Sequence, residues 1–267
     1  MKNLFKIALC QMMVAGDKEQ NHGRAAALVE EAVLGDAQVV CLPEIWNGPY
    51  DLKLFGGFAE QEDGPTAALL SGLAGRLGIY LIGGSIPERD GDAVYNTSLV
   101  FGPTGSLIAK HRKVHLFDID VENGIRFKES DFFSAGDSFT VFDTDFGKMG
   151  VAICFDLRFP GMFQKMAKAG ATLVFLPASF NMTTGHAHWD ILLKSRALDN
   201  QIYMAACAAA RNPKASYTSW GHSCVLTPWG EFCAATDARE AIVYADIDLE
   251  YMRKVRNEIP LGNQPAD

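Results

Sequence analysis

The stretch Gly35-Asp-Ala-Gln-Val-Val-Cys-Leu-Pro-Glu44 has a counterpart later in the chain, Gly170-Ala-Thr-Leu-Val-Phe-Leu-Pro-Ala178. In both stretches a helical pattern ends at a glycine, and a short apolar run then ends at Leu-Pro. Apolar runs of this length suit strands that are buried on both faces. The chain is therefore predicted to contain two related halves, each built around a buried strand that follows a helix.

A second pair of segments supports this repeat. Residues 98–109 and 223–234 both have the pattern of two strands joined by a turn with Pro and Gly at hairpin positions. The matched residues are Ser98, Val100, Pro103, Gly105 and Ala109 in the first segment and Ser223, Val225, Pro228, Gly230 and Ala234 in the second.

Helical patterns precede or follow these strands. Apolar residues at helical spacing predict helices over 21–34 and 156–169, and a third from Pro65 to Gly78. Such helices cover one face of each sheet, and stacking the two sheets buries the other faces. We therefore predict an α/β fold, a four-layer α-β-β-α sandwich with two pseudo-repeated halves. We expect one domain over residues 1–260, followed by a short C-terminal tail at 261–267.

Composition narrows the class of protein. The chain has 267 residues and a net charge of −8 without a basic stripe, which argues against a nucleic-acid partner. We expect no membrane span, because no apolar run reaches about 18 residues. The six cysteines form no C-x-x-C pair, so the sequence predicts neither a metal site nor a redox pair. Unpaired thiols and the lack of a recognisable signal sequence predict a cytoplasmic protein.

Cys154 is a candidate nucleophile. It follows the strand pattern Lys-Met-Gly-Val-Ala-Ile at residues 148–153 and precedes a predicted helix. A cysteine beside a helix N-terminus has a lowered pKa, which would favour the thiolate. The alternative is an ordinary core cysteine, as expected for Cys10, Cys41, Cys207 and Cys224 in their apolar runs.

Glu44 and Lys113 also follow predicted strands, and reactive groups of open α/β sheets collect beyond strand ends. Taken singly, either residue could belong to a solvated surface. With Cys154 they suit hydrolysis of an amide. The cysteine would attack the carbonyl, Glu44 would transfer the protons, and Lys113 with the backbone N–H of Phe155 would hold the oxyanion. This chemistry needs neither a metal nor a cofactor.

The three candidates lie in segments that resemble the signatures of the nitrilase, or carbon–nitrogen hydrolase, superfamily. The segments are Leu42-Pro43-Glu44, Arg112-Lys113-Val114-His115-Leu116 and Ile153-Cys154-Phe155-Asp156-Leu157-Arg158-Phe159-Pro160. The resemblance spans about residues 7–260 and implies the same four-layer fold, in a homodimer. It also implies that Glu129, in Phe127-Lys128-Glu129-Ser130, lies beside Lys113 and keeps it charged and oriented.

Finer features resemble the ω-amidase branch of this superfamily. They include Phe180-Asn181-Met182-Thr183-Thr184-Gly185 and Lys214-Ala215-Ser216-Tyr217. The resemblance implies hydrolysis of the terminal amide of a small 2-oxo dicarboxylic acid monoamide, such as 2-oxoglutaramate or 2-oxosuccinamate. The product carboxylates would be released with ammonia.

Such a substrate carries a carboxylate, for which arginine is the best partner. Arg158 is our candidate, four residues after Cys154, with an ion pair to Asp156 or another loop acid as the alternative. Phe180 and Thr184, placed on the loop after the strand that ends at Leu176-Pro177, would supply an apolar wall and a hydroxyl donor.

Other functions stay open at this point. The same residues would serve an amidase for deaminated glutathione or a carbamoyl-amine hydrolase. A thiol hydrolase could use His115 or His222 as its base. A non-catalytic relative could keep the fold as a binding scaffold.

Overall fold

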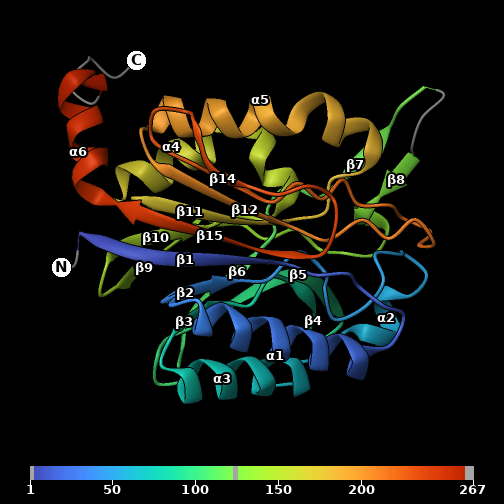
Figure 1. The fold of residues 1–267 in the computed structure, drawn as a ribbon. Helices are drawn as coiled ribbons and strands as arrows, with labels where there is room; N and C mark the ends of the chain where they lie inside the picture. Colours follow the sequence, from blue (N-terminus) through green and yellow to red (C-terminus); the bar gives the residue numbers. More distant parts are fainter. Residues whose placement is uncertain (1–2, 123–125, 262–267) are drawn as a thin grey trace.

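Two β-sheets face each other between two outer layers of helices (Figure 1). The computed structural model describes residues 3–122 and 126–261. The first sheet has the order β15-β1-β2-β3-β5-β4, with β6 paired to β5, and the second has the order β14-β13-β12-β11-β10-β9. The strands of the first sheet are β1 (Leu4–Gln11), β2 (Val39–Cys41), β3 (Tyr80–Ile82), β4 (Ile86–Asp90), β5 (Ala93–Phe101), β6 (Leu107–Arg112) and β15 (Ala241–Asp248). Those of the second are β9 (Thr140–Thr144), β10 (Gly147–Val151), β11 (Leu173–Ala178), β12 (Tyr203–Ala208), β13 (Cys224–Leu226) and β14 (Phe232–Ala235).

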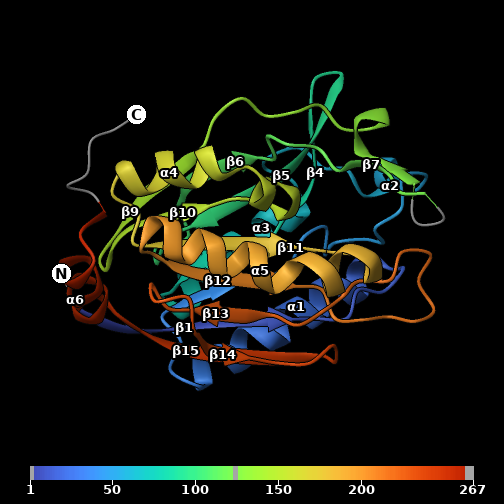
Figure 2. The same ribbon diagram turned by 90° about the horizontal axis from the view of Figure 1, so that it is seen from above.

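The outer layers cover one face of each sheet. Helices α1 (Lys18–Leu34) and α3 (Pro65–Leu77) lie on the first sheet, and α4 (Pro160–Lys168) and α5 (Met182–Asn200) lie side by side on the second (Figures 1 and 2). The predicted four-layer sandwich is therefore confirmed. The remaining elements are α2 (Phe55–Phe58), α6 (Leu249–Glu258), a small ribbon of β7 (Asp118–Asp120) and β8 (Arg126–Lys128), and 3₁₀ turns at Glu129–Asp131 and Cys154–Arg158.

The predicted repeat is visible in the strand topology. In each sheet three parallel strands, β1-β2-β3 or β10-β11-β12, continue into an antiparallel hairpin, β5-β6 or β13-β14. The hairpins share a register shift at the same place, at Val100 in one and Val225 in the other. Their turns share a glycine with positive φ, +79° at Gly105 and +77° at Gly230. The two halves therefore share their strand order and also the register shift and the turn glycine of their hairpins.

Helix α3 has the boundaries that the sequence predicted, whereas the helix predicted over 156–169 does not. Helix α3 begins at Pro65 and ends before Gly78, which has φ +66° and donates its N–H to Ala74, as predicted. The continuous helix predicted over 156–169 is wrong. The chain instead forms the 3₁₀ turn at Cys154–Arg158, becomes extended at Phe159 and starts α4 at Pro160. The residue before a proline is disfavoured in helical conformation, which explains the break.

The inner faces of the two sheets form a shared apolar core. Side chains of β1, β2 and β3 meet those of β10, β11 and β12, among them Leu9, Cys41, Val151 and Phe175. Cys10, Cys41, Cys207 and Cys224 are buried, as predicted for core residues. Within the described residues no helix is long and apolar enough to cross a bilayer. Of the predicted tail 261–267, all but Leu261 lies outside the described residues.

Gly84 packs closely against the segment that carries Glu44, and replacing Gly84 by alanine tests this contact. Gly84 has φ +64°, and a Cβ there would lie 2.1 Å from the carbonyl oxygen of Pro43. Gly91 has a similar φ of +58° but open space around it. We expect Gly91→Ala to cost about 1–2 kcal/mol, the penalty of the left-handed conformation alone. Gly84→Ala should cost clearly more, as measured by denaturant unfolding. Equal losses would contradict the close approach.

Candidate active site

Four charged or nucleophilic side chains meet where strands of both sheets end. Glu44 follows β2, Lys113 follows β6, Cys154 follows β10, and Glu129 lies in a 3₁₀ turn after β8. Each has at most 3% of its surface exposed. The structure therefore brings together the four residues for which the sequence predicted a catalytic role, in a site largely closed to water.

Lys113 lies between the two carboxylates. Its Nζ is 2.9 Å from Oε1 of Glu44 and 2.8 Å from Oε2 of Glu129. Glu129 also accepts a hydrogen bond from the Tyr50 hydroxyl and one of 2.7 Å from the backbone N–H of Phe117. Glu129 is thus fully occupied as a partner, which fixes Lys113 from the side opposite Glu44.

The charges in this cluster depend on one another. Burial alone would lower the pKa of Lys113, but the charges of Glu129 and Glu44 more than offset it, so that the pKa is raised well above its usual value. Burial raises the pKa of Glu44, and the charge of Lys113 works against this rise. Lys113 is therefore charged at neutral pH and stabilises the carboxylate of Glu44.

Cys154 differs from the sequence prediction in its ionisation. Burial, followed by the charge of Glu44, raises the pKa of the Cys154 thiol well above its usual value. The predicted lowering of this pKa is wrong. Only a short 3₁₀ turn follows the cysteine, so no helix dipole compensates for the loss of water. The neutral thiol needs a neighbouring base before it can attack. Cys154 also has φ +45°, a conformation that non-glycine residues rarely adopt outside functional turns.

Arg158, Phe180 and Thr184 line one crevice with Cys154. The crevice has about 0 Å³ of space for a water-sized molecule. The Nε of Arg158 is buried and has no hydrogen-bond partner among the described residues. Its Nη2 lies 3.1 Å from Nδ1 of His188. The guanidinium group faces the rings of Phe155 and Phe180 at 5.4 and 5.6 Å.

Two details of this crevice differ from the sequence analysis. Thr184 lies in the first turn of α5 and not on the preceding loop. Asn181 caps this helix, and the Thr184 hydroxyl donates to its Oδ1 at 3.2 Å. Asp156, the alternative partner of Arg158, instead accepts hydrogen bonds from other groups, so the alternative ion pair does not form.

Asp156 joins the turn of Cys154 to the segment of Lys113. Its carboxylate lies 3.1 Å from Nε2 of His111 and 2.7 Å from Nδ1 of His115, and accepts from the backbone N–H of His115 and Ile153. The ring of His115 stacks on Phe159 at 3.5 Å. Burial alone would raise the pKa of Asp156, but these hydrogen bonds bring it well below its usual range. Neither His115 nor His222 lines the crevice, as far as the structure describes the chain.

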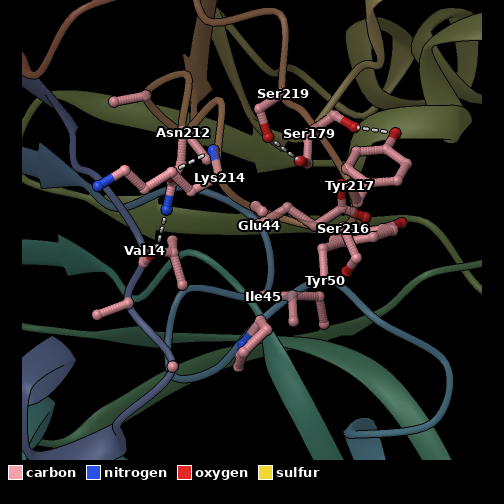
Figure 3. Close-up of a pocket in the computed structure, with 16 residues that line it drawn as sticks. Val14, Glu44, Ile45, Tyr50, Ser179, Asn212, Lys214, Ser216, Tyr217 and Ser219 are labelled. Atoms are coloured by element: carbon pink, nitrogen blue, oxygen red, sulfur yellow. Dashed lines mark hydrogen bonds between the residues drawn. The ribbon is translucent and has the colours of Figure 1, made fainter.

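A separate cavity of about 270 Å³ is lined by Glu44 (Figure 3). Tyr50, Lys214 and Ser216 line it, and Ser179 and Tyr217 line both this cavity and the crevice. The Tyr217 hydroxyl donates to the carbonyl of Ser179 at 2.6 Å. Tyr217 and Ser179 therefore stand between the space beside Glu44 and the space beside Cys154.

Sequence reasoning missed several residues of the site. Asn96 and Asp156 are buried polar residues that contact the four central side chains or their segments, and Tyr50 contacts Glu129. Asn96 had a detectable signal, because Asn-Thr-Ser at 96–98 interrupts an otherwise apolar strand. Tyr50 lies in a loop and had no such signal.

Comparisons with known proteins place this site in a family. The carbon–nitrogen hydrolase family model matches residues 6–257. The chain belongs to this family, and it is therefore a hydrolase of carbon–nitrogen bonds within the nitrilase superfamily. The predicted family, fold and class of enzyme are confirmed.

Individual relatives cover almost the whole chain. Omega-amidase NIT2 of Xenopus tropicalis is 50% identical over 260 residues, which cover 97% of this chain and 94% of the relative. Omega-amidase NIT2 of Homo sapiens is 48% identical with the same coverage. The crystal structure of Saccharomyces cerevisiae Nit3, a member of branch 10 of the nitrilase superfamily, is similar with a TM-score of 0.92 and 40% identity. The match covers 99% of this chain and 97% of that structure.

Replacement of Asp156 tests its part in holding the site together. Asp156→Asn removes a buried charge that accepts hydrogen bonds from two histidines, and we expect a loss of about 3–5 kcal/mol in the free energy of unfolding. Because the folded pKa of Asp156 is lowered, its contribution is complete above the unfolded pKa of about 4 and falls as the pH drops further. Urea unfolding between pH 7 and pH 3 measures this difference.

The exposed Asp143 on β9 offers a matched control. Asp143→Asn should leave stability within about 0.5 kcal/mol of the original chain at each pH. The same loss in both variants would contradict a special role for Asp156.

Proposed function

We propose that this enzyme is an ω-amidase that hydrolyses the terminal amide of small 2-oxo dicarboxylic acid monoamides, such as 2-oxoglutaramate and 2-oxosuccinamate. The observation that carries this proposal is the half-buried guanidinium group of Arg158. It lies in the same crevice as Cys154 and lacks an acidic partner among the described residues. A buried cation without a counter-ion is suited to a substrate carboxylate. The relatives named omega-amidase support the assignment.

The proposed reaction begins with proton transfer from Cys154 to Glu44. The thiolate sulfur attacks the amide carbon, and the carbonyl oxygen takes up the negative charge. Glu44 then gives the proton to the leaving nitrogen, the carbon–nitrogen bond breaks, and ammonia and an acyl thioester result. Glu44 next takes a proton from water as the hydroxyl attacks the thioester. When the intermediate collapses, the carboxylic acid forms and the proton returns to the thiol.

Lys113 stabilises the oxyanion in this scheme. Its ammonium group has three N–H donors, and Glu44 and Glu129 occupy two directions. The third N–H and the backbone N–H of Phe155 would hold the oxyanion, each worth about 10²–10³ in rate. Glu129 acts through Lys113, because its two oxygens are engaged by Lys113, Tyr50 and Phe117.

The acyl part of the substrate would extend from Cys154 toward Arg158. Phe180 provides an apolar wall, and the Thr184 hydroxyl donates to the substrate when it turns away from Asn181. Because the crevice has about 0 Å³ of space for a water-sized molecule, its side chains must move apart before an acyl chain can enter. The proposed binding partner of the enzyme is thus its small-molecule amide substrate. The proposed reaction uses no metal or cofactor.

Ammonia release from two amides tests the carboxylate site. Arg158→Ala should lower kcat/KM for 2-oxoglutaramate by about 10- to 100-fold, mainly through KM, because one charge-assisted pairing is lost. Activity toward butyramide, which has no carboxylate, should change little. Cys154→Ala should abolish both reactions.

Two outcomes would contradict the proposal. An equal loss on both amides in Arg158→Ala would show that Arg158 serves the fold and not the carboxylate. Preference of the unaltered enzyme for deaminated glutathione or N-carbamoyl-β-alanine over 2-oxoglutaramate would overturn the substrate assignment while leaving the cysteine chemistry in place.

We also propose that the chain forms a homodimer through the outer face of α5. Ile191 and Leu198 on this helix are 63% and 47% exposed, and Trp229 and Phe232 beside it are 42% and 38% exposed. The turn at Gly230 packs against Leu198, so these side chains form one apolar surface. A second copy would bury it.

The unpaired cysteines support a cytoplasmic location for the assembly.

Charge placed on this surface tests the dimer. Leu198→Asp should shift the sedimentation mass from two chains to one, because a carboxylate would be buried in an apolar interface. Leu34, 86% exposed at the end of α1 on the opposite outer layer, provides the control. Leu34→Asp should keep the dimer. A dimer that survives Leu198→Asp would contradict this interface.

A further inference from the structure

The two carboxylate oxygens of Glu44 have different surroundings. Oε1 accepts two hydrogen bonds, from Nζ of Lys113 at 2.9 Å and from Nδ2 of Asn96 at 2.9 Å. Oε2 is buried and has no hydrogen-bond partner among the described residues. One oxygen is thus saturated with donors, and the other keeps its lone pairs free.

Asn96 is placed to act on both charged neighbours. It lies on β5, is fully buried, and its backbone carbonyl accepts a 2.8 Å hydrogen bond from the N–H of Lys113. Its side chain at the same time reaches Glu44 across 52 positions of sequence. The amide must point its N–H₂ at the carboxylate, because its own oxygen would repel the carboxylate oxygen. A single strand residue therefore links the backbone of the lysine to the side chain of the glutamate.

We propose that Asn96 is a positioning residue that, together with Lys113, occupies Oε1 of Glu44 and so makes Oε2 the oxygen that carries protons in the reaction. This inference rests on the proposed role of Glu44 as the base and acid of the amidase. The carboxylate cannot rotate without breaking two hydrogen bonds. The oxygen without donors then meets the thiol, the leaving nitrogen and water in turn.

The hydrogen bond from Asn96 also affects the pH at which Glu44 loses its proton. Burial raises the pKa of Glu44, and the charge and hydrogen bond of Lys113 oppose that rise. A hydrogen bond from a neutral donor such as Asn96 favours the charged carboxylate in the same direction. Loss of the Asn96 donor removes part of this opposition. The base then stays protonated up to a higher pH, and the acid limb of the pH–rate profile moves upward.

The test compares Asn96→Leu, which keeps the side-chain size but loses the donor, with Ser98→Ala. Ser98 lies on the same strand, is equally buried, and has a hydroxyl without a partner in the described part of the chain. In Asn96→Leu we expect the acid limb of kcat/KM for 2-oxoglutaramate to move up by about one to two pH units. We also expect a fall in kcat of at least about tenfold, with KM little changed. Ser98→Ala should keep the original profile.

The outcomes separate this inference from the proposed function. An unmoved acid limb in a folded Asn96→Leu, or the same limb in Asn96→Leu and Ser98→Ala, overturns the role of Asn96. If Asn96→Leu does not fold, Asn96→Ser applies the same criterion, because its hydroxyl is too short to reach Glu44. Glu44→Gln provides the reference. If it keeps full activity, the proposed amidase mechanism fails, whereas an inactive Glu44→Gln beside an unaffected Asn96→Leu removes only the role of Asn96.

Discussion

The burial of one ammonium group between two carboxylates is the constraint on which the rest of the site depends. Lys113, Glu44 and Glu129 are each at most 1% exposed. Buried charges cost several kcal/mol each unless their partners are well placed. Lys113 therefore requires both carboxylates, and Glu129 requires the further donors from Tyr50 and Phe117. The positions of these side chains are closely defined because a buried charge without a partner would destabilise the folded protein.

The fold meets this constraint by combining strand ends from both sheets. Glu44 follows a strand of the first sheet and Cys154 a strand of the second, and the two sheets share one apolar core. Asp156 fastens the turn of Cys154 to His111 and His115, which flank Lys113. Asp156 thus links the turn of the proposed nucleophile to the segment of the proposed oxyanion donor through hydrogen bonds.

The sequence predicted the fold well because its information is local and repeated. The paired Leu-Pro strand ends and the paired hairpins are patterns within short segments, and they led to the four layers. The sequence also indicated Glu44, Lys113 and Cys154, because polar groups at strand ends stand out against apolar runs. Their grouping with Glu129 depended on resemblance to a family.

Features that depend on surroundings could not be predicted. The pKa of Cys154 is raised because the residue is buried beside Glu44, and the chain order alone does not reveal that burial. The helix predicted across Phe159 breaks because the preference of the residue before Pro160 outweighs the apolar spacing. Asn96 interrupts an apolar strand and Asp156 lies two residues before Arg158, but neither pattern reveals their contacts with Glu44 or with His111 and His115, which are distant in the sequence.

We infer that Cys154 forms a covalent acyl intermediate beside Lys113 and Glu44. Rapid acid quenching during turnover of 2-oxoglutaramate, followed by mass spectrometry of peptides, tests this claim directly. We expect a thioester of the 2-oxo diacid on the peptide that contains Cys154, and none on that peptide in Cys154→Ser. Turnover without any adduct under single-turnover conditions, or an adduct on another of the six cysteines, would contradict it.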